Sequence, residues 1–182
     1  MTAKYSWMIL LAAILLSSGS CCVAGEKKTV GKAAPRDSVS VEWYKYDKGL
    51  AKAKAENKHV FLFFRSKWCK WCNLMEKKTF TDQGVVNRLN KNFIPIKIDF
   101  DSRSKDMDLS GKKISDSNVA EMYNIFSFPY LVFLEPDQAN IGVLPGYAEG
   151  KDLLLILEYV GDNHHKDKSF EEFLKVKKEK GK

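Results

Sequence analysis

The strongest constraint on the fold is an uninterrupted apolar run from Val60 to Phe64. Five apolar residues are too few for a helix and suit a strand that is buried on both of its faces. The C-x-x-C pair Cys69 and Cys72 follows closely, and Met75 lies at helical spacing from Cys72. The sequence therefore predicts a buried strand that leads directly into a helix beginning at this cysteine pair.

Apolar periodicity, caps and turn residues predict the other elements. In order, we expect a strand at 39–44, a helix capped by Asp47 and running to Lys58, a helix after Thr81 or Asp82, a strand at 93–100, a polar loop at 102–113, a helix from Ser115 or Ser117, a hairpin of strands at 129–134 and 141–144 that turns at Pro136-Asp137, and a helix at 152–160 ended by Gly161. A further amphipathic helix begins at a capping box that starts with Ser169. Alternating strands and helices predict an α/β fold whose central sheet has helices on both faces. Pro95 cannot donate to a ladder, so its strand is expected at an edge or with a bulge.

The first residues have the order of a secretory signal. Lys4 precedes an apolar run from Trp7 to Leu16, and small residues follow it. This run is shorter than the ~20 residues of a membrane-spanning helix. We expect export to a periplasm or secretion, with two alternatives: a lipid anchor on Cys21, or a retained membrane anchor. The expected organisation is a signal peptide at 1–24, a linker at 25–37, a main domain at 38–161, and an amphipathic helix with a basic tail at 162–182.

Composition and charge narrow the class of protein. Hydrophobic residues make up 45% of the 182 residues, enough for one ordinary domain with a real core. The formal charge is +7, but the basic residues are spread along the chain. No element combines clustered basic residues with aromatic ones, as nucleic-acid binders usually do. We therefore expect no nucleic-acid partner, and a monomer.

The cysteine spacing favours chemistry over structural stabilisation. Cleavage after Ala24 would leave only Cys69 and Cys72 in the mature chain. A disulfide that closes so short a loop constrains the unfolded chain little. At the first turn of a helix, free N–H groups and the helix dipole favour the thiolate that attacks disulfides, and Lys70 adds a positive charge. Cys69 is therefore the expected nucleophile, and Cys72, one turn later, the resolving cysteine.

Other roles for the pair and for the polar loop remain open at this point. A c-type haem site would need histidine where Asn73 stands. A zinc site would need two more ligands, for which His59 and the pair His164-His165 are candidates; we expect the latter pair in a solvated loop between helices. A purely structural disulfide is the third alternative. Residues 106–117 match the first half of a calcium-binding EF-hand loop but end in serine where a bidentate glutamate belongs.

Two motifs resemble a known family. Trp68-Cys69-Lys70-Trp71-Cys72 resembles the W-C-x-x-C active site of the thioredoxin superfamily, and the residues after it resemble the branch with small periplasmic thioredoxins and the C-terminal domain of DsbD-type reductases. Tyr123-Asn124-Ile125-Phe126-Ser127-Phe128-Pro129 resembles the family's Y-x-I-x-x-x-P segment, whose proline is cis and lies against the cysteines. The similarity extends from about Val41 to Val160. It implies a thioredoxin-like fold, to which the capping box at Ser169 adds a C-terminal helix. It also implies a site with catalytic Cys69 and Cys72 and substrate contacts at Trp68, Lys70, Trp71, Phe128, Pro129 and Gly146, with Trp71 serving either packing or the substrate.

The chain departs from the family pattern at three places. Phe63 stands where typical thioredoxins carry a buried aspartate that assists proton transfer from the resolving thiol. Arg65 replaces a common aromatic residue, and the dipeptide Lys70-Trp71 replaces Gly-Pro between the cysteines. The proton acceptor for Cys72 must therefore be another group or water.

The function expected from these residues is exchange between a dithiol and a disulfide. The protein would reduce protein disulfides or relay electrons to the disulfide of a redox partner. It would need no cofactor and no metal, because the two sulfur atoms carry the electrons. The rival hypothesis is a non-catalytic binding or chaperone-like module that keeps the fold and uses the groove beside Pro129.

Overall fold

The computed structural model describes residues 39–102, 105–107 and 113–180. These residues belong to one unit of the chain, 37–182. The signal peptide expected at 1–24, Cys21, and the linker expected at 25–37 lie outside the described residues. Within the described ranges, no helix combines the length and apolar character needed to cross a membrane.

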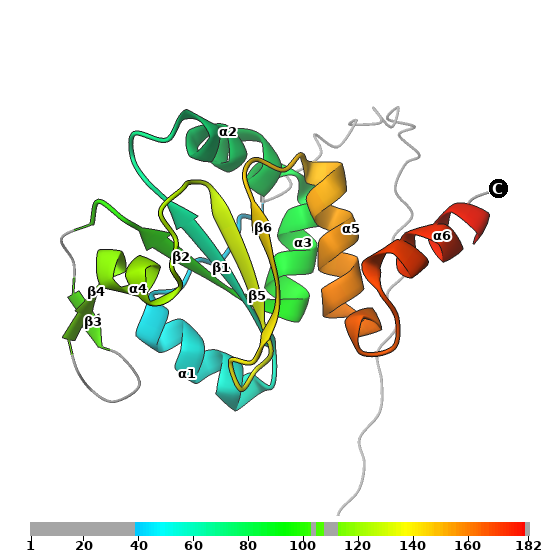
Figure 1. Ribbon diagram of the computed structural model, residues 1–182, viewed down its shortest axis with the longest axis horizontal. Coiled ribbons are helices and arrows are strands. Elements are labelled where there is room, and N and C mark those ends of the chain that lie inside the picture. Colours follow the sequence, from blue (N-terminus) through cyan, green and yellow to red (C-terminus); the bar gives the residue numbers. More distant parts are fainter. Residues whose placement is uncertain (1–38, 103–104, 108–112, 181–182) are drawn as a thin grey trace, which may run out of the picture. The chain divides into compact units, whose positions relative to one another are not determined.

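Four strands form one mixed sheet in the order β2-β1-β5-β6 (Figure 1). Strand β1 (His59–Arg65) runs parallel to β2 (Phe93–Asp99) and antiparallel to β5 (Tyr130–Leu134), which pairs antiparallel with β6 (Asn140–Pro145). The expected hairpin around Pro136-Asp137 is thus confirmed. Strand β2 lies at an edge of the sheet, as Pro95 predicted.

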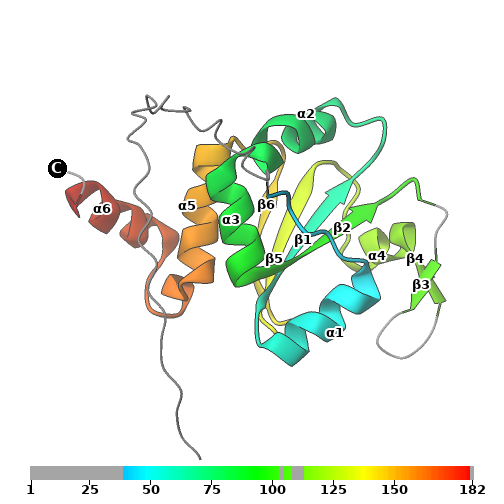
Figure 2. The same ribbon diagram turned by 180° about the vertical axis from the view of Figure 1, so that it is seen from behind.

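Helices cover both faces of this sheet (Figures 1 and 2). Helices α1 (Tyr46–Glu56) and α4 (Asp116–Met122) pack on one face, and α2 (Lys70–Lys78), α3 (Gln83–Asn92) and α5 (Gly150–Gly161) pack on the other. Two short 3₁₀ helices, η1 (Thr79–Thr81) and η2 (His164–Lys166), and the final helix α6 (Phe170–Lys180) complete the chain. The expected α/β architecture with an additional C-terminal helix is therefore present.

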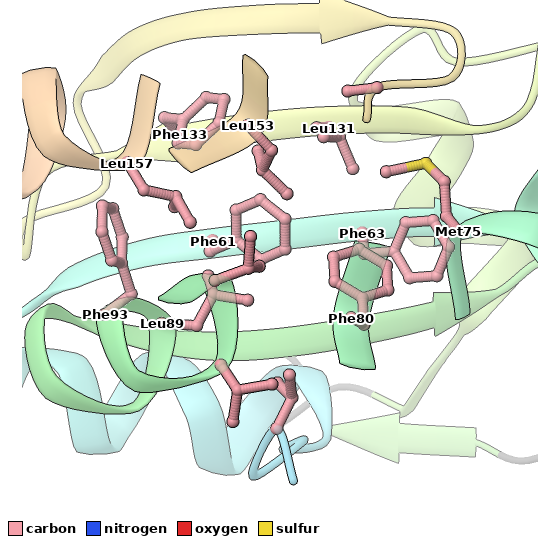
Figure 3. Close-up of a cluster of buried hydrophobic side chains, with 14 of the residues drawn as sticks. Phe61, Phe63, Met75, Phe80, Leu89, Phe93, Leu131, Phe133, Leu153 and Leu157 are labelled. Atoms are coloured by element: carbon pink, nitrogen blue, oxygen red, sulfur yellow. The ribbon is translucent and has the colours of Figure 1, made fainter. Parts of the chain in front are cut away.

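The apolar run that predicted β1 supplies both halves of the core. Because side chains alternate along a strand, Phe61 and Phe63 face α2, α3 and α5, whereas Leu62 and Phe64 face α1 and α4. All four side chains are fully buried. Figure 3 shows the first of these clusters, in which Phe61 and Phe63 lie among Met75, Phe80, Leu89, Phe93, Leu131, Phe133, Leu153 and Leu157.

The strand expected at 39–44 is wrong. Only Tyr44 bridges to β2, where its N–H donates to the Pro95 carbonyl oxygen (2.8 Å) and its own carbonyl accepts from the Lys97 N–H (3.3 Å). Since Pro95 has no N–H, the outer side of β2 cannot continue a regular ladder. Val41 and Trp43 pack in the core instead, whereas Val39 is exposed.

Other boundaries also differ from expectation. The polar loop expected at 102–113 is wrong in part, because strands β3 (Lys105–Met107) and β4 (Lys113–Ser115) pair with each other there. Helix α1 begins after Lys45 rather than after an Asp47 cap, and α5 includes Gly161. The expected caps at Asp82 and Ser115 and the capping box at Ser169 are confirmed.

Candidate active site

Strand register brings three separate segments to one end of the sheet. Residue Phe64, near the carboxyl end of β1, pairs with Tyr130 at the start of β5, and Tyr130 pairs with Pro145 at the end of β6. The segment that follows β1, the segment that precedes β5 and the segment that follows β6 therefore meet at this end. These segments contain every site residue that the sequence predicted.

The two cysteines are joined by a disulfide at the start of α2. Cys69 is the N-cap of α2, and its Sγ accepts a hydrogen bond from the Cys72 N–H (3.0 Å). The Cα atoms lie 5.2 Å apart. Cys69 is partly exposed, whereas Cys72 is completely buried. One sulfur can therefore meet a partner from solution while the other stays shielded.

The predicted proline segment lies beside this pair. The Phe128–Pro129 peptide bond is cis, and Pro129 is buried. Its carbonyl oxygen accepts a hydrogen bond from the Gly146 N–H (2.9 Å). Gly146 has a φ of +88°, a backbone conformation that favours glycine. Phe128 packs against both core clusters, one on each face of the sheet.

The two tryptophans of the motif differ in their surroundings. Trp68 is 81% exposed, and the Lys67 ammonium lies 5.0 Å from the centre of its ring. Trp71 is 53% exposed, and its ring centre lies 5.4 Å from that of Tyr147. Trp71 therefore packs on a neighbour and still presents much of its ring to solvent. Lys70, the first residue of α2, is also exposed.

The position of the missing aspartate is filled by an aromatic cluster. Phe63 is fully buried, and its ring centre lies 4.9 Å from that of Phe80 and 5.7 Å from that of Trp43. Figure 3 shows Phe63 and Phe80. No carboxylate can act on Cys72 from this position of β1.

A group of charged residues that the sequence did not predict links α2 to the sheet. Arg65, at the end of β1, donates from Nη1 to Asp99 of β2 (2.8 Å) and from Nη2 to Asn73 of α2 (2.9 Å). Its Nε lies 3.4 Å from a carboxylate oxygen of Glu76, whose other oxygen accepts from Lys97 Nζ (2.7 Å). The Arg65 side chain is 12% exposed, whereas those of Glu76 and Asp99 are 28% and 33% exposed, so the guanidinium is shielded and its partners remain partly in contact with water.

A second carboxylate holds the loop between β1 and α2. One oxygen of Asp101 accepts from the Ser66 hydroxyl (2.6 Å) and from the Lys67 N–H (2.8 Å), and the Ser66 hydroxyl oxygen accepts from the Trp68 N–H (3.3 Å). The hydrogen bonds from Ser66 and Lys67 keep the pKa of Asp101 below its ordinary value. Asp101 therefore remains ionised and fixes the loop that carries Trp68 towards Cys69.

The sequence pattern indicates which face of β2 these charged residues occupy, but it does not identify their partners. Arg65 ends an apolar strand, and Lys97 and Asp99 alternate with isoleucines in β2, which places them on the same face as α2. Glu76 follows Cys72 by four residues, one helical turn. Sequence spacing alone does not show that these side chains meet.

The histidines considered as metal ligands lie at the other end of β1. Buried His59 begins that strand, and its Nδ1 lies 3.3 Å from Glu135, while His165 Nε2 lies 2.9 Å from the other oxygen of the same carboxylate. The solvated loop expected for this region is wrong for His165, whose side chain is 10% exposed. Within the part of the chain that the structure describes, no group of three or more His, Cys, Asp or Glu is arranged to hold a metal ion. Residues 108–112 of the EF-hand-like stretch lie outside that part.

Several known proteins are similar to this chain in sequence or in fold. An uncharacterized Caenorhabditis elegans protein is 35% identical over 98 residues, which are 53% of this chain and 13% of that protein. The thiol:disulfide interchange protein DsbD of Campylobacter jejuni is 25% identical over 119 residues, 63% of this chain and 19% of DsbD. This chain therefore spans less than a fifth of the length of both relatives.

A solved thioredoxin and a family model complete the comparison. The solution structure of a thioredoxin from Thermus thermophilus superimposes with a TM-score of 0.55 at 27% identity and covers 66% of this chain and 87% of that one. The family model described as a thioredoxin-like domain matches residues 46–161, which include both cysteines and the cis proline. The resemblance seen in the two motifs is thus confirmed, and the chain belongs to the thioredoxin-like domain family of the thioredoxin superfamily.

Proposed function

We propose that this protein is a thiol–disulfide oxidoreductase in which Cys69 attacks and Cys72 resolves. The observation that carries the proposal is the disulfide at the N-terminus of α2, in which Cys69 is partly exposed and Cys72 is buried. Free N–H groups at a helix N-terminus favour the thiolate of the cysteine placed there. The similarity to an interchange protein of the DsbD type supports the same reaction class.

The two cysteines can carry all the electrons of the exchange, so the reaction needs no cofactor. In the reducing direction, the Cys69 thiolate attacks one sulfur of a substrate disulfide, forms a mixed disulfide and releases the other substrate sulfur as a thiolate. Cys72 then loses its proton, attacks Cys69 Sγ and releases the second substrate sulfur. Both substrate thiolates take up protons, so two electrons pass to the substrate and the protein keeps the disulfide. A dithiol partner must reduce that disulfide before the next turnover.

We further propose Glu76 as the group that receives the Cys72 proton, directly or through water. It follows Cys72 by four residues, one turn of α2, and the buried Phe63 leaves no carboxylate in the usual place. Lys97 and Arg65 hold its carboxylate at the interface between α2 and β2.

The substrate contacts proposed from the family resemblance are compatible with the geometry. An extended segment would pair with the backbone of Phe128 and lie against Pro129, close to the Gly146 backbone. The exposed residues Trp68, Lys70 and Trp71 flank Cys69 in the sequence and are available to the same segment.

We also propose that the protein acts mainly as a reductant outside the cytoplasm, as a monomer exported by the signal peptide at 1–24. The dipeptide Lys70-Trp71 lacks the histidine that strongly oxidising relatives place between their cysteines. We expect a potential nearer to ~−270 mV than to ~−120 mV. Equilibration with glutathione buffers measures it, and a value above about −150 mV would mark an oxidant instead.

Insulin reduction tests the activity directly. The wild-type protein, supplied with a dithiol reductant, should precipitate the insulin B chain, and the Cys69→Ser variant should not. The Cys72→Ala variant should accumulate mixed disulfides with its partners, which can be isolated and identified. A folded wild-type protein that does not reduce insulin, together with a Cys72→Ala variant that traps no partner, would favour the non-catalytic binding module.

A further inference from the structure

Large exposed aromatic side chains gather at the disulfide end of the sheet. Trp68, Phe126 and Trp71 are 81%, 77% and 53% exposed, and the other large exposed apolar residues of the described chain are aliphatic. Aromatic side chains left in water at one place typically mark a surface that binds another protein, and tryptophan contributes strongly to such surfaces. The packing of the chain itself leaves these three rings largely uncovered.

Strand register places Phe126 at the same end as the two tryptophans. The chain leaves β1 after Arg65 towards Cys69, and it enters β5 at Tyr130, the partner of the penultimate residue of β1. The ring centre of Phe128 lies 5.3 Å from that of Phe100, whose N–H donates to the Arg65 carbonyl oxygen (2.9 Å). The segment with Phe126 is therefore bound to the base of the loop that presents Cys69.

The free charges beside these rings are positive. Lys67 and Lys70 are exposed, and neither forms an ion pair with a carboxylate among the described residues. Of the carboxylates in the same region, Asp99 is paired with Arg65, and the ionised Asp101 is held by the Ser66 hydroxyl and the Lys67 N–H. Asp101 offsets one of the two lysine charges, so an approaching polypeptide meets two unpaired ammonium groups and a net positive charge from Lys67, Lys70 and Asp101.

We propose that Trp68, Trp71 and Phe126, together with Lys67 and Lys70, recognise an acidic polypeptide segment with large apolar side chains next to its reactive disulfide. The proposal rests on the proposed function and names the class of its substrate. Aromatic rings fit the apolar side chains, and the two ammonium groups complement carboxylates near the disulfide.

The same charges disfavour a second copy of this chain as the occupant. In a two-fold symmetric contact the same surface faces itself, so the four ammonium groups of two copies would be brought together. Like charges in contact weaken association. A basic polypeptide is disfavoured for the same reason.

Binding can be measured apart from exchange. Three synthetic peptides of one length carry serine in place of both cysteines: one with glutamate and phenylalanine flanks, one with lysine and phenylalanine, and one with glutamate and serine. Affinity for the oxidised protein is measured by titration calorimetry. We expect the first peptide to bind about fivefold more tightly than either other peptide, and the advantage over the lysine peptide to fall below about twofold at high salt.

Charge reversal and truncation provide matched controls. The double variant Lys67→Glu/Lys70→Glu should reverse the order of the acidic and basic peptides, whereas Lys77→Glu, two turns further along α2, should preserve it. Trp68→Ala should weaken binding of both phenylalanine peptides, whereas Val176→Ala, an exposed apolar residue of α6, should not. Equal affinities of the acidic and basic peptides, or an order that survives the double charge reversal, overturn the proposal.

The disulfide forms of the peptides separate this proposal from the proposed function. If the protein reduces the acidic phenylalanine peptide severalfold faster than the basic one, the result supports both the recognition surface and the oxidoreductase function. Reduction at equal rates overturns only the recognition surface. Selective binding of the acidic peptide without any reduction overturns the oxidoreductase and keeps the surface.

Discussion

Two cysteines only three residues apart occupy different environments. Cys69 caps α2 and is partly exposed, whereas Cys72 is fully buried. We expect an alkylating reagent near neutral pH to modify Cys69 first in the reduced protein, because that sulfur is accessible and sits at the helix N-terminus. Peptide mapping after short exposure measures the order. Faster labelling of Cys72 would contradict both assigned roles.

At the same scale, Arg65 connects three chain segments through one guanidinium. Replacing it with glutamine removes a shielded guanidinium, 12% exposed, from two partly exposed carboxylates, Asp99 and Glu76. We expect Arg65→Gln to lower the free energy of unfolding by about 2 kcal/mol, measured by urea denaturation.

Arg88 offers a matched control. It pairs with Asp162 at 2.7 Å, but both side chains are more exposed, 25% and 39%. Arg88→Gln should therefore cost no more than about 1 kcal/mol. Equal costs for the two arginines would show that the Arg65 cluster adds nothing beyond a surface ion pair.

Helices and strands with a clear apolar pattern or a capping residue could be predicted from the sequence. Elements and contacts that depend on residues far apart in the sequence could not. The VFLFF run identified β1, and the cap at Asp82 and the capping box at Ser169 marked helix starts. The three-residue strands β3 and β4 pair only with each other and are too short to show a period. Arg65 and Asp99 are 34 residues apart, so their contact depends on the parallel register of β1 and β2.

Helix α1 approaches β2 closely at Gly49, which predicts that a larger residue there destabilises the protein. A Cβ at Gly49 would lie 2.4 Å from Cγ1 of Ile96, a fully buried side chain. Gly49→Ala must displace that side chain or the helix, so we expect a loss of about 1–3 kcal/mol in unfolding free energy.

Gly142 of β6 provides a control for Gly49→Ala, with the stability of both variants measured by thermal and urea unfolding. A Cβ added there meets no atom within 4 Å. Gly142→Ala should change stability far less than Gly49→Ala. If both variants unfold like the wild type, the tight packing between α1 and β2 is refuted.

On the scale of the whole molecule, one carboxylate joins the sheet to the C-terminal segment. Glu135, just after β5, meets His59 of β1 and His165 of η2, and Lys166 lies 3.6 Å away. Burial lowers the pKa of His59 below its ordinary value of 6.5, against the opposing attraction of Glu135. The unfolded chain therefore binds a proton on this imidazole at a higher pH than the folded chain does.

The sign of the pH dependence follows from that difference. As the pH falls through about 6.5, unfolding takes up a proton at His59, so the folded state loses stability, by at most ~1.4 kcal/mol per pH unit from this group. We expect His59→Gln to flatten the slope of unfolding free energy between pH 7.5 and 5.5, measured by urea denaturation. An unchanged slope in that variant would exclude His59 as the source.

The placement of that anchor has a practical consequence for handling the protein. His59 is the first residue of β1 and Cys69 follows the other end of that strand, so η2 and the start of α6 attach to the sheet far from the dithiol (Figure 1). A dye, bead or electrode linker coupled to an exposed residue of α6, such as Lys175, is therefore expected to leave the reactive face turned towards solution. The fold thus offers an oriented attachment point for an immobilised redox reagent.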